Sequence, residues 1–253
     1  MSDDPEPPAT YPATVRALAP HGVLRVGVNL SNFLLVSGTD EDGSPIGVSP
    51  SLAAALARAL DIDHELVTYL EPGEVVDGLA RGMIDVGNVG ADPSRAEQVV
   101  FTPPYCEIEA TYLVPAGSSI TTTTEVDVPG VRIASKQGAA YTLWLDRNVA
   151  RAEVVHTNTI EQSFQVFVAD RLEVLAGLRP RLLEEAKRLP GSRVLDDRFT
   201  SVQQAIGVHK DRGGDALAYL QRFVAWAIDS GLVAGTIEEH RVNGLSVASP
   251  PAA

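Results

Sequence analysis

The stretch GLARGMIDVGNVGADPSRAEQVVFTPPY, residues 78–105, holds the pattern that decides the fold class. A predicted helix that ends at about Met83 runs directly into the apolar segment IDVGNVG (84–90), which indicates a buried strand. A polar turn that contains Arg95 follows, and VVFTPPY (99–105) then leads into another apolar segment. A helix followed at once by a buried strand is the unit from which α/β proteins are built.

The same alternation of strands and helices extends outward along the chain. Ser49-Pro50 is typical of a helix start, and Leu52, Leu56 and Leu60 behind it define a buried helical face. The segments that read as strands are 23–30, 64–70, 84–90, 131–135, 152–157, 173–177, 192–196 and 205–210. This order predicts an α/β protein with mainly parallel sheets. Residues 1–20 and the final SVASPPAA lack periodicity, so we expect both to be flexible.

Length and charge narrow the class of protein. The 253 residues are enough for two lobes, and 20 Lys+Arg against 33 Asp+Glu give a net charge of −13. That charge argues against a nucleic-acid partner, although a local cluster of basic residues can still bind a small anion. Cys106 is the only cysteine, which excludes an internal disulfide and a thiolate metal cluster. No stretch approaches the roughly 20 apolar residues of a membrane span.

From about Leu24 to Val242 the sequence resembles the family 3 extracellular solute-binding proteins. The similar segments are LRVGVN, DGSPIGVSPSLAAALARAL, residues 78–105, PGVRIASKQGAAY and LAYLQRFVAWAIDSGLVAGTIEEHRV. The resemblance implies a two-lobed periplasmic-binding-protein-like type II fold with two hinge crossovers. It assigns 21–110 and 203–253 to lobe 1, 111–202 to lobe 2, and 1–20 to a flexible tail. A ligand would lie between the lobes, which would close on it.

The resemblance first indicates ligand contacts in and just after the strand 84–90. An arginine follows this strand in the family and grips a substrate carboxylate, so Arg95 is expected to bind ligand. A planar guanidinium can meet a carboxylate with two parallel hydrogen bonds. The alternative is a solvated surface arginine. Asn88 and Gly90 are expected to offer an amide and a backbone group, although Gly90 stands where the family has Ser or Thr; it can equally serve close backbone approach.

Three further candidates follow the first strand. Asn29, Asn32 and Phe33 stand where the family places a polar residue and an aromatic wall, and polar side chains beside an aromatic ring suit a ligand lining. The alternative interpretation is a pair of loop asparagines with a core phenylalanine.

In lobe 2, the resemblance indicates contacts at Lys136, Gly138 and Ala139, which precede a predicted helix. Free N–H groups at a helix start attract anions, and Lys136 would add positive charge. The family often has Thr at the positions of Ala139 and Ala140, so side-chain donors are lost there.

Gly177-Leu178-Arg179 departs most from the family, whose amino-acid binders carry an Asp after such a Gly to pair with the ligand ammonium group. Arg179 places a cation there instead and is expected to contact the ligand; the alternative is an arginine on the surface of its helix. Glu107 or Glu109 can replace the missing acid only if it faces the ligand. The charge balance favours an anionic ligand without an ammonium group.

The resulting prediction is a solute-binding protein that captures a small carboxylate-bearing anion, a carboxylic, hydroxy- or amino acid, for an ABC-type uptake system. It would be a monomer that works with an ABC permease and has no enzyme activity, cofactor, metal, nucleic acid or membrane span. A dehydratase-like enzyme on the same fold and a cytosolic small-molecule sensor stay open as alternatives. The resemblance implies a periplasmic or extracellular location. The acidic start of the chain carries no export signal, which favours the cytoplasm if the sequence is complete.

Overall fold

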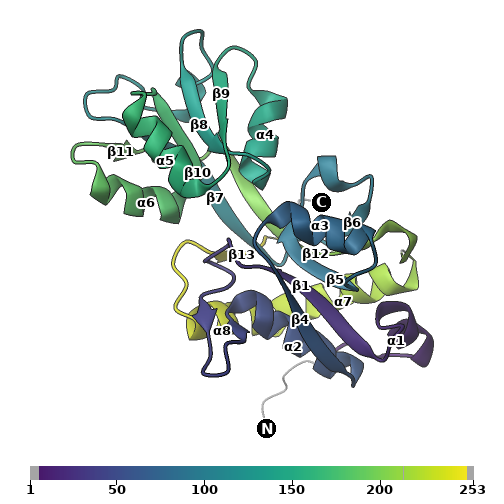
Figure 1. The fold of residues 1–253 in the computed structure, drawn as a ribbon. Helices are drawn as coiled ribbons and strands as arrows, with labels where there is room; N and C mark the ends of the chain where they lie inside the picture. The colour runs from purple at the N-terminus through teal and green to yellow at the C-terminus, as the bar shows by residue number, and fades with distance from the viewer. Residues whose placement is uncertain (1–5, 213, 250–253) are drawn as a thin grey trace. The chain divides into compact units, whose positions relative to one another are not determined.

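The computed structural model describes residues 6–212 and 214–249, and the chain divides into two compact units. Unit 1 comprises Met1–Glu107 and Gln203–Ala253, and unit 2 comprises Ile108–Val202. The chain passes between the units twice, within β7 (Cys106–Val114) and within β12 (Thr200–His209). Unit 2 is therefore one continuous segment inserted into unit 1. Figure 1 labels most of the helices and strands of both units.

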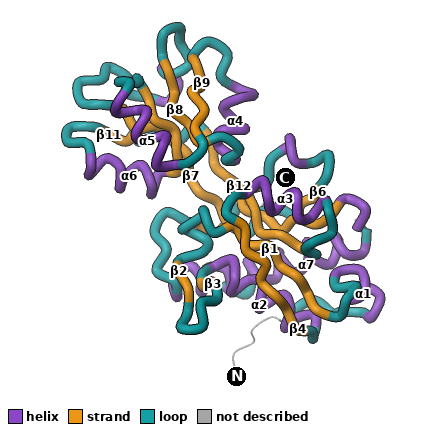
Figure 2. The backbone as a smooth tube through the Cα atoms, viewed as in Figure 1, coloured by secondary structure: helices purple, strands orange, loops and turns teal. Residues whose placement is uncertain are grey.

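The sheet of unit 1 is mostly parallel. Its order is β4 (Asp63–Tyr69), β1 (Val23–Asn29), β5 (Val86–Gly90) and β12, and β6 (Val99–Phe101) also pairs with β12. β1 runs parallel to β4 and to β5, whereas β12 runs antiparallel to β5. The strand segments appear in orange in Figure 2. The prediction of an α/β protein is confirmed.

Helices bury apolar side chains on this sheet. The helices of unit 1 are α1 (Pro12–Leu18), α2 (Val48–Leu60), α3 (Pro72–Ala80), α7 (Asp215–Asp229) and α8 (Leu232–Glu239). The predicted face of α2 is confirmed, because Leu52, Leu56 and Leu60 are all buried. Gly87 allows α3 to lie close to the sheet, since a Cβ atom at this position would be 2.6 Å from Val75 Cγ1.

Two short elements lie where the sequence indicated flexible ends. Helix α1 packs against α7 and buries Leu18 completely, so the prediction of a flexible tail is wrong for residues 12–18. At the other end, β13 (Ser246–Val247) pairs with Glu107 and Cys106 of β7. Residues 1–5 and 250–253 of the predicted tails lie outside the described residues.

Unit 2 repeats the strand–helix alternation. Its order is β7, β10 (Val174–Leu178), β8 (Arg132–Lys136) and β9 (Glu153–Thr157), with β11 (Arg193–Val194) paired to β7. β8 is parallel to β9 and β10, and β7 is antiparallel to β10. Its helices are α4 (Ala140–Asn148), α5 (Ile160–Ala169) and α6 (Arg179–Arg188).

Both faces of this second sheet are covered. Ile133 of β8 packs with Leu145 of α4 on one face, whereas its neighbour Ala134 belongs to a cluster with Phe164, Phe167 and Leu182 from α5 and α6. A strand that is buried on both faces can be apolar at successive positions rather than alternating, as Ile133-Ala134 of β8 and Val174-Leu175 of β10 are.

The remaining short elements are the hairpin strands β2 (Gly38–Thr39) and β3 (Pro45–Ile46), and the 3-10 helices η1 (Pro93–Arg95), η2 (Thr123–Glu125) and η3 (Lys210–Arg212). η1 directly follows β5, and it carries the arginine that the sequence singled out.

Candidate functional site

The carboxyl ends of the parallel strands of unit 1 meet at one edge of the sheet, because β4, β1 and β5 all run in the same direction. Asn29 ends β1 and Gly90 ends β5, so the fold brings these two candidates to the same edge. The Oδ1 atom of Asn29 accepts hydrogen bonds from N (3.1 Å) and Oγ (2.8 Å) of Ser31. The carbonyl oxygen of the Asn29 side chain therefore shapes the turn that follows β1.

Next along this turn, Asn32 accepts a hydrogen bond from Leu34 N at its Oδ1 atom (3.3 Å). Phe33 is 40% exposed, so it is not the core phenylalanine of the alternative interpretation. Leu70 follows β4 at the same edge and is 69% exposed. The sequence did not single out Leu70, because the apolar pattern placed this residue within the predicted strand 64–70. Phe33 and Leu70 give this edge apolar surface beside its polar groups.

Arg95 lies just beyond β5 and is only 7% exposed. Asp92 fixes the start of η1, because its Oδ1 atom accepts hydrogen bonds from N (2.9 Å) and Oγ (2.7 Å) of Ser94. The Nη1 atom of Arg95 donates to the carbonyl oxygen of Gly90. Burial lowers the pKa of the Arg95 guanidinium, and the charge of Asp92 opposes that shift. The alternative of a solvated surface arginine is wrong.

Asn88 is more deeply buried than the other two candidate asparagines, Asn29 and Asn32. Its side chain is buried, and Nδ2 donates to the carbonyl oxygen (3.2 Å) and Oγ (2.7 Å) of Ser49 in the first turn of α2. Both amide hydrogens are thus used to fasten α2 to β5. This contact gives Asn88 a structural role in unit 1.

In unit 2, Lys136, Gly138 and Ala139 lie together at the carboxyl end of β8. Lys136 ends this strand and is 6% exposed, and Gly138 has a φ of +74°, a conformation that favours glycine. Ala139 precedes α4 with extended backbone and no side-chain cap. The start of α4 therefore lies beside Lys136, and the binding of an anion there stays a prediction.

A pair of hydroxyl groups holds this loop in place. Thr142 Oγ1 donates to the carbonyl oxygen of Lys136 (2.6 Å) and lies 2.7 Å from Ser135 Oγ. All three residues are buried. The backbone around Lys136 is therefore fixed by the interior of unit 2.

Arg179 is bound within unit 2. Its Nε atom donates to Glu109 Oε2 (2.6 Å), and its Nη1 and Nη2 atoms donate to the carbonyl oxygens of Leu195 and Asp196 (both 2.8 Å). Glu109 also lies 3.6 Å from Arg198 Nη1. Because Glu109 offsets its charge, Arg179 no longer argues for an anionic ligand. For the same reason, Glu109 is not the replacement for the missing ammonium partner.

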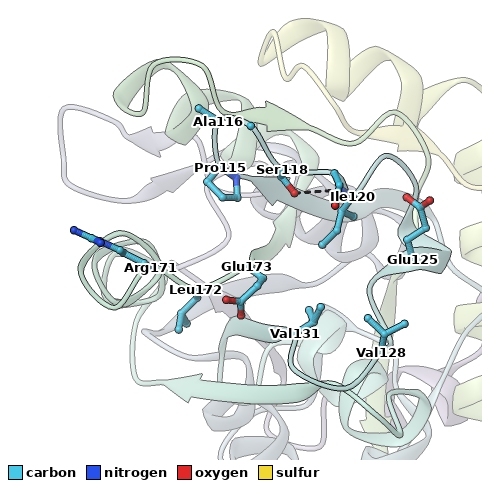
Figure 3. A pocket seen from close by; sticks show the side chains of 12 residues that line it. Pro115, Ala116, Ser118, Ile120, Glu125, Val128, Val131, Arg171, Leu172 and Glu173 are labelled. Carbon is cyan, nitrogen blue, oxygen red and sulfur yellow. Dashed lines mark hydrogen bonds between the residues drawn. The ribbon is translucent and has the colours of Figure 1, made fainter.

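A hollow of about 620 Å³ lies at the other edge of the unit 2 sheet. Figure 3 shows its lining, which includes Val131 before β8 and Leu172 before β10. Glu173 also lines it and forms an ion pair with Arg132 at 2.9 Å. Because this edge holds the amino ends of β8 and β10, the hollow contains none of the candidate ligand residues.

Metal-ligating clusters and membrane-spanning helices are both absent from residues 6–212 and 214–249. Within these ranges, no cluster of three or more His, Cys, Asp or Glu side chains is arranged to hold a metal ion. None of the helices in the same ranges combines the length and the apolar character that crossing a membrane requires. Cys106 is fully buried, and burial raises the pKa of its thiol, which disfavours the reactive thiolate form.

Comparison with known proteins identifies the family and the fold. The family model of the bacterial extracellular solute-binding proteins, family 3, matches residues 24–240. No curated protein matches the chain. Many solved structures are similar to it, and three of them illustrate the range.

The first is an ancestral amino acid-binding protein, AncCDT-1, described as a precursor of cyclohexadienyl dehydratase: 21% identity, 89% of this chain and 98% of that chain covered, TM-score 0.71. The second is a putative binding component of an ABC transporter from Wolinella succinogenes complexed with lysine: 21% identity, 87% and 95% covered, TM-score 0.71. The third is a solute receptor for L-cysteine of Neisseria gonorrhoeae: 22% identity, 91% and 95% covered, TM-score 0.71. At these identities the likeness shows a shared fold.

Proposed function

Because the chain belongs to the bacterial extracellular solute-binding proteins of family 3, we propose that it binds a small carboxylate-bearing solute for an ABC-type uptake system. The protein would bind this solute without converting it. Similar structures in complex with lysine or named as receptors for L-cysteine support a ligand of amino-acid size. The closure of the two units on the ligand, which the family resemblance implies, stays a prediction.

The observation that carries the proposal is the buried guanidinium of Arg95 at the carboxyl end of β5. A guanidinium has five N–H donors in one plane, so it can bind both oxygens of a carboxylate while keeping its bond to Gly90. Burial also strengthens such a contact, because water competes less for the charges. We therefore assign the ligand carboxylate to Arg95.

The other candidate groups suit the same ligand. Asn29, Asn32 and Phe33 line the same sheet edge of unit 1 and can surround the body of the solute. Unit 2, considered by itself, would favour a ligand with negative charge, because Lys136 is a cation and α4 begins at Ala139 without a side-chain cap. We leave Asn88 and Arg179 out of the ligand site, because their donors are used by Ser49 and by Glu109.

The ligand is expected to be an acid rather than an ammonium-bearing amino acid. Leu178 precedes α6 at the position where amino-acid binders of the family carry an acid, and its side chain cannot pair with an ammonium group. We expect carboxylic and hydroxy acids to bind more tightly than ordinary amino acids.

Calorimetry on the purified chain with a panel of carboxylic, hydroxy- and amino acids tests the proposal. Arg95→Ala should weaken the binding of every acid that the wild type binds, by about 2–5 kcal/mol, and Arg95→Lys should recover only part of this loss because lysine cannot bind bidentately. Arg58→Ala, on the exposed side of α2, is the matched control and should bind like the wild type.

Unchanged affinity in Arg95→Ala would show that Arg95 is not the carboxylate anchor. Tight binding of an ordinary amino acid would overturn the preference for acids. Release of a chemically altered solute after incubation, detected by mass spectrometry, would contradict binding without turnover.

A further inference from the structure

We propose that the side-chain amide of Gln204 accepts a hydrogen bond from the ligand and selects carboxylates that carry a hydroxyl group. This inference rests on the proposed function, because it assigns a further residue to the site that Arg95 anchors. Gln204 lies in β12, outside every segment that the sequence analysis connected with the ligand.

Strand register places Gln204 beside the arginine anchor. Gln204 is paired with Gly90 across β12 and β5, and two residues further along Ile206 is paired with Asn88. Residues paired across antiparallel strands project from the same face of the sheet. Since Arg95 donates to the carbonyl oxygen of this same Gly90, Gln204 and Arg95 flank one glycine at the carboxyl end of β5.

Burial makes the amide of Gln204 unusual. The side chain is 3% exposed, and within the described residues its Oε1 atom has no hydrogen-bonding partner. A buried acceptor without a partner destabilises a fold, so such an atom in a binding protein is well explained by a ligand that supplies the donor.

Two nearby amides show the contrast. Gln203, the preceding residue, uses its Nε2 atom to donate to Glu107 Oε2 at 2.8 Å. Asn88, on the neighbouring strand, gives both amide hydrogens to Ser49. Unit 1 thus engages the amides around Gln204 in internal hydrogen bonds, whereas the oxygen of Gln204 itself is not engaged.

The chemistry of the amide oxygen defines the ligand group. Oε1 only accepts, so its partner must be a donor, either a hydroxyl or an ammonium group. A neutral amide does not offset the charge of an ammonium group in a buried site. Gly90 has no side chain with which to bind a hydroxyl. A hydroxyl on a carbon near the carboxylate is therefore the group that fits.

Pairs of acids that differ only in a hydroxyl group test the inference. Affinities are measured by calorimetry for lactate against propionate and for malate against succinate. The wild type should bind the hydroxy acid at least about tenfold more tightly, because a buried acceptor rejects the analogue that leaves it unpaired. Gln204→Met, which keeps the length of the side chain, should reduce this ratio to about one while the binding of propionate or succinate is retained.

Gln203→Met is the matched control, since it removes an amide from the same strand whose bond partner is Glu107, and it should keep the hydroxyl preference. If Gln204→Met does not fold, Gln204→Asn retains the amide but shortens it by one methylene, and it should lower the ratio in the same direction.

Three results would overturn the inference. Acids that bind the wild type with no hydroxyl preference would contradict it alone and leave the role of Arg95 intact. An equal loss of hydroxy and deoxy acids in Gln204→Met would identify Gln204 as a structural residue that bonds an ordered water. If no acid of either pair binds the wild type, this result contradicts both the proposed binding of small carboxylates and the inference about Gln204.

Discussion

Each unit holds the starts of two neighbouring strands together with an arginine–carboxylate ion pair, and the two pairs differ in how deeply they are buried. In unit 1, Arg25 near the start of β1 donates from Nε (3.0 Å) and Nη2 (2.9 Å) to Asp85, which precedes β5. In unit 2, Arg132 at the start of β8 donates from Nε and Nη2 (both 2.9 Å) to Glu173, which precedes β10.

The likeness extends to the backbone. In each pair the acid also accepts a bond from the backbone N–H of its arginine, at 3.0 Å in unit 1 and 2.9 Å in unit 2. In each pair the arginine Nη2 also donates to a carbonyl oxygen shortly before the acid, that of Gly82 or of Arg171. The two units thus use one arrangement to join β1 to β5 and β8 to β10.

The difference lies in burial and in the number of arginines. The Asp85 side chain is 0% exposed and binds a second arginine, Arg212, at 2.7 Å, whereas the Glu173 side chain is 35% exposed. A buried acid between two arginines cannot be removed without leaving unpaired charge, while an exposed pair is screened by water. The Arg25–Asp85 pair is therefore expected to contribute much more to the stability of the fold than the Arg132–Glu173 pair.

Removing the acid from each unit tests this contrast most directly. Asp85→Ala should lower the free energy of unfolding by about 3 kcal/mol, because Arg25 and Arg212 lose their shared partner. Glu173→Ala should have a much smaller effect, because water screens the half-exposed pair. Urea denaturation followed by circular dichroism measures both variants. Equal losses would refute the assignment of the difference to burial.

A second comparison concerns one arginine from each unit. Arg179→Gln should destabilise the protein by about 1–3 kcal/mol, because it breaks charged hydrogen bonds to Glu109 and to the carbonyl oxygens of residues 195 and 196. The affinity for acids should change far less than in Arg95→Ala. Thermal unfolding and calorimetry on the same samples separate the two effects, and a loss of affinity equal to that of Arg95→Ala would return Arg179 to the ligand site.

The smallest predicted effect concerns how the stability of the protein depends on pH. Burial acts to raise the pKa of Asp85, but hydrogen bonds from Arg25 and Arg212 hold it below its ordinary value. Hydrogen bonds from Arg132 lower the pKa of Glu173 as well. A carboxyl whose folded pKa is lowered stabilises the fold above its unfolded pKa, and this stabilisation is lost as the pH falls through the folded value.

The melting temperature of the wild type should therefore fall below about pH 4, near the unfolded pKa of Asp and Glu. Asp85→Asn removes one of the titrating groups, so its melting temperature should start lower and fall less steeply. Thermal scans between pH 7 and pH 2 measure both slopes. Parallel curves would mean that Asp85 does not contribute to the acid sensitivity.

Local patterns predicted most of the fold. The repeat of Leu52, Leu56 and Leu60 identified the buried face of α2 because helical periodicity depends only on neighbours in sequence. Helix α1 was missed, since its seven residues bury only Thr14 and Leu18 and it packs on α7, far along the chain. So short a helix leaves no repeat to read, and packing against a distant element stabilises it.

The candidate site was less accessible to sequence reasoning. The position of Arg95 after β5 followed from the motif, but its burial did not. The bond from Arg179 to Glu109 joins residues 70 apart, and the contact of Asn88 with Ser49 joins residues 39 apart. Such pairings depend on how the strands and helices are brought together in space. The engaged amide of Asn88 and the unengaged oxygen of Gln204 therefore became apparent only in the structure.

The insertion of unit 2 into unit 1 has a consequence for the newborn chain at the ribosome. Unit 2 leaves the ribosome as one continuous segment and can complete its core, whereas β5 and β6 must wait for β12. The backbone N–H of Ile206 bonds to Thr102 Oγ1, and 104 residues separate the two. At the usual pace of translation, roughly 5–20 residues per second, β5 keeps an unpaired edge for about 5–20 seconds. During that interval the edge of the strand that leads to Arg95 is open to mispairing and to chaperones.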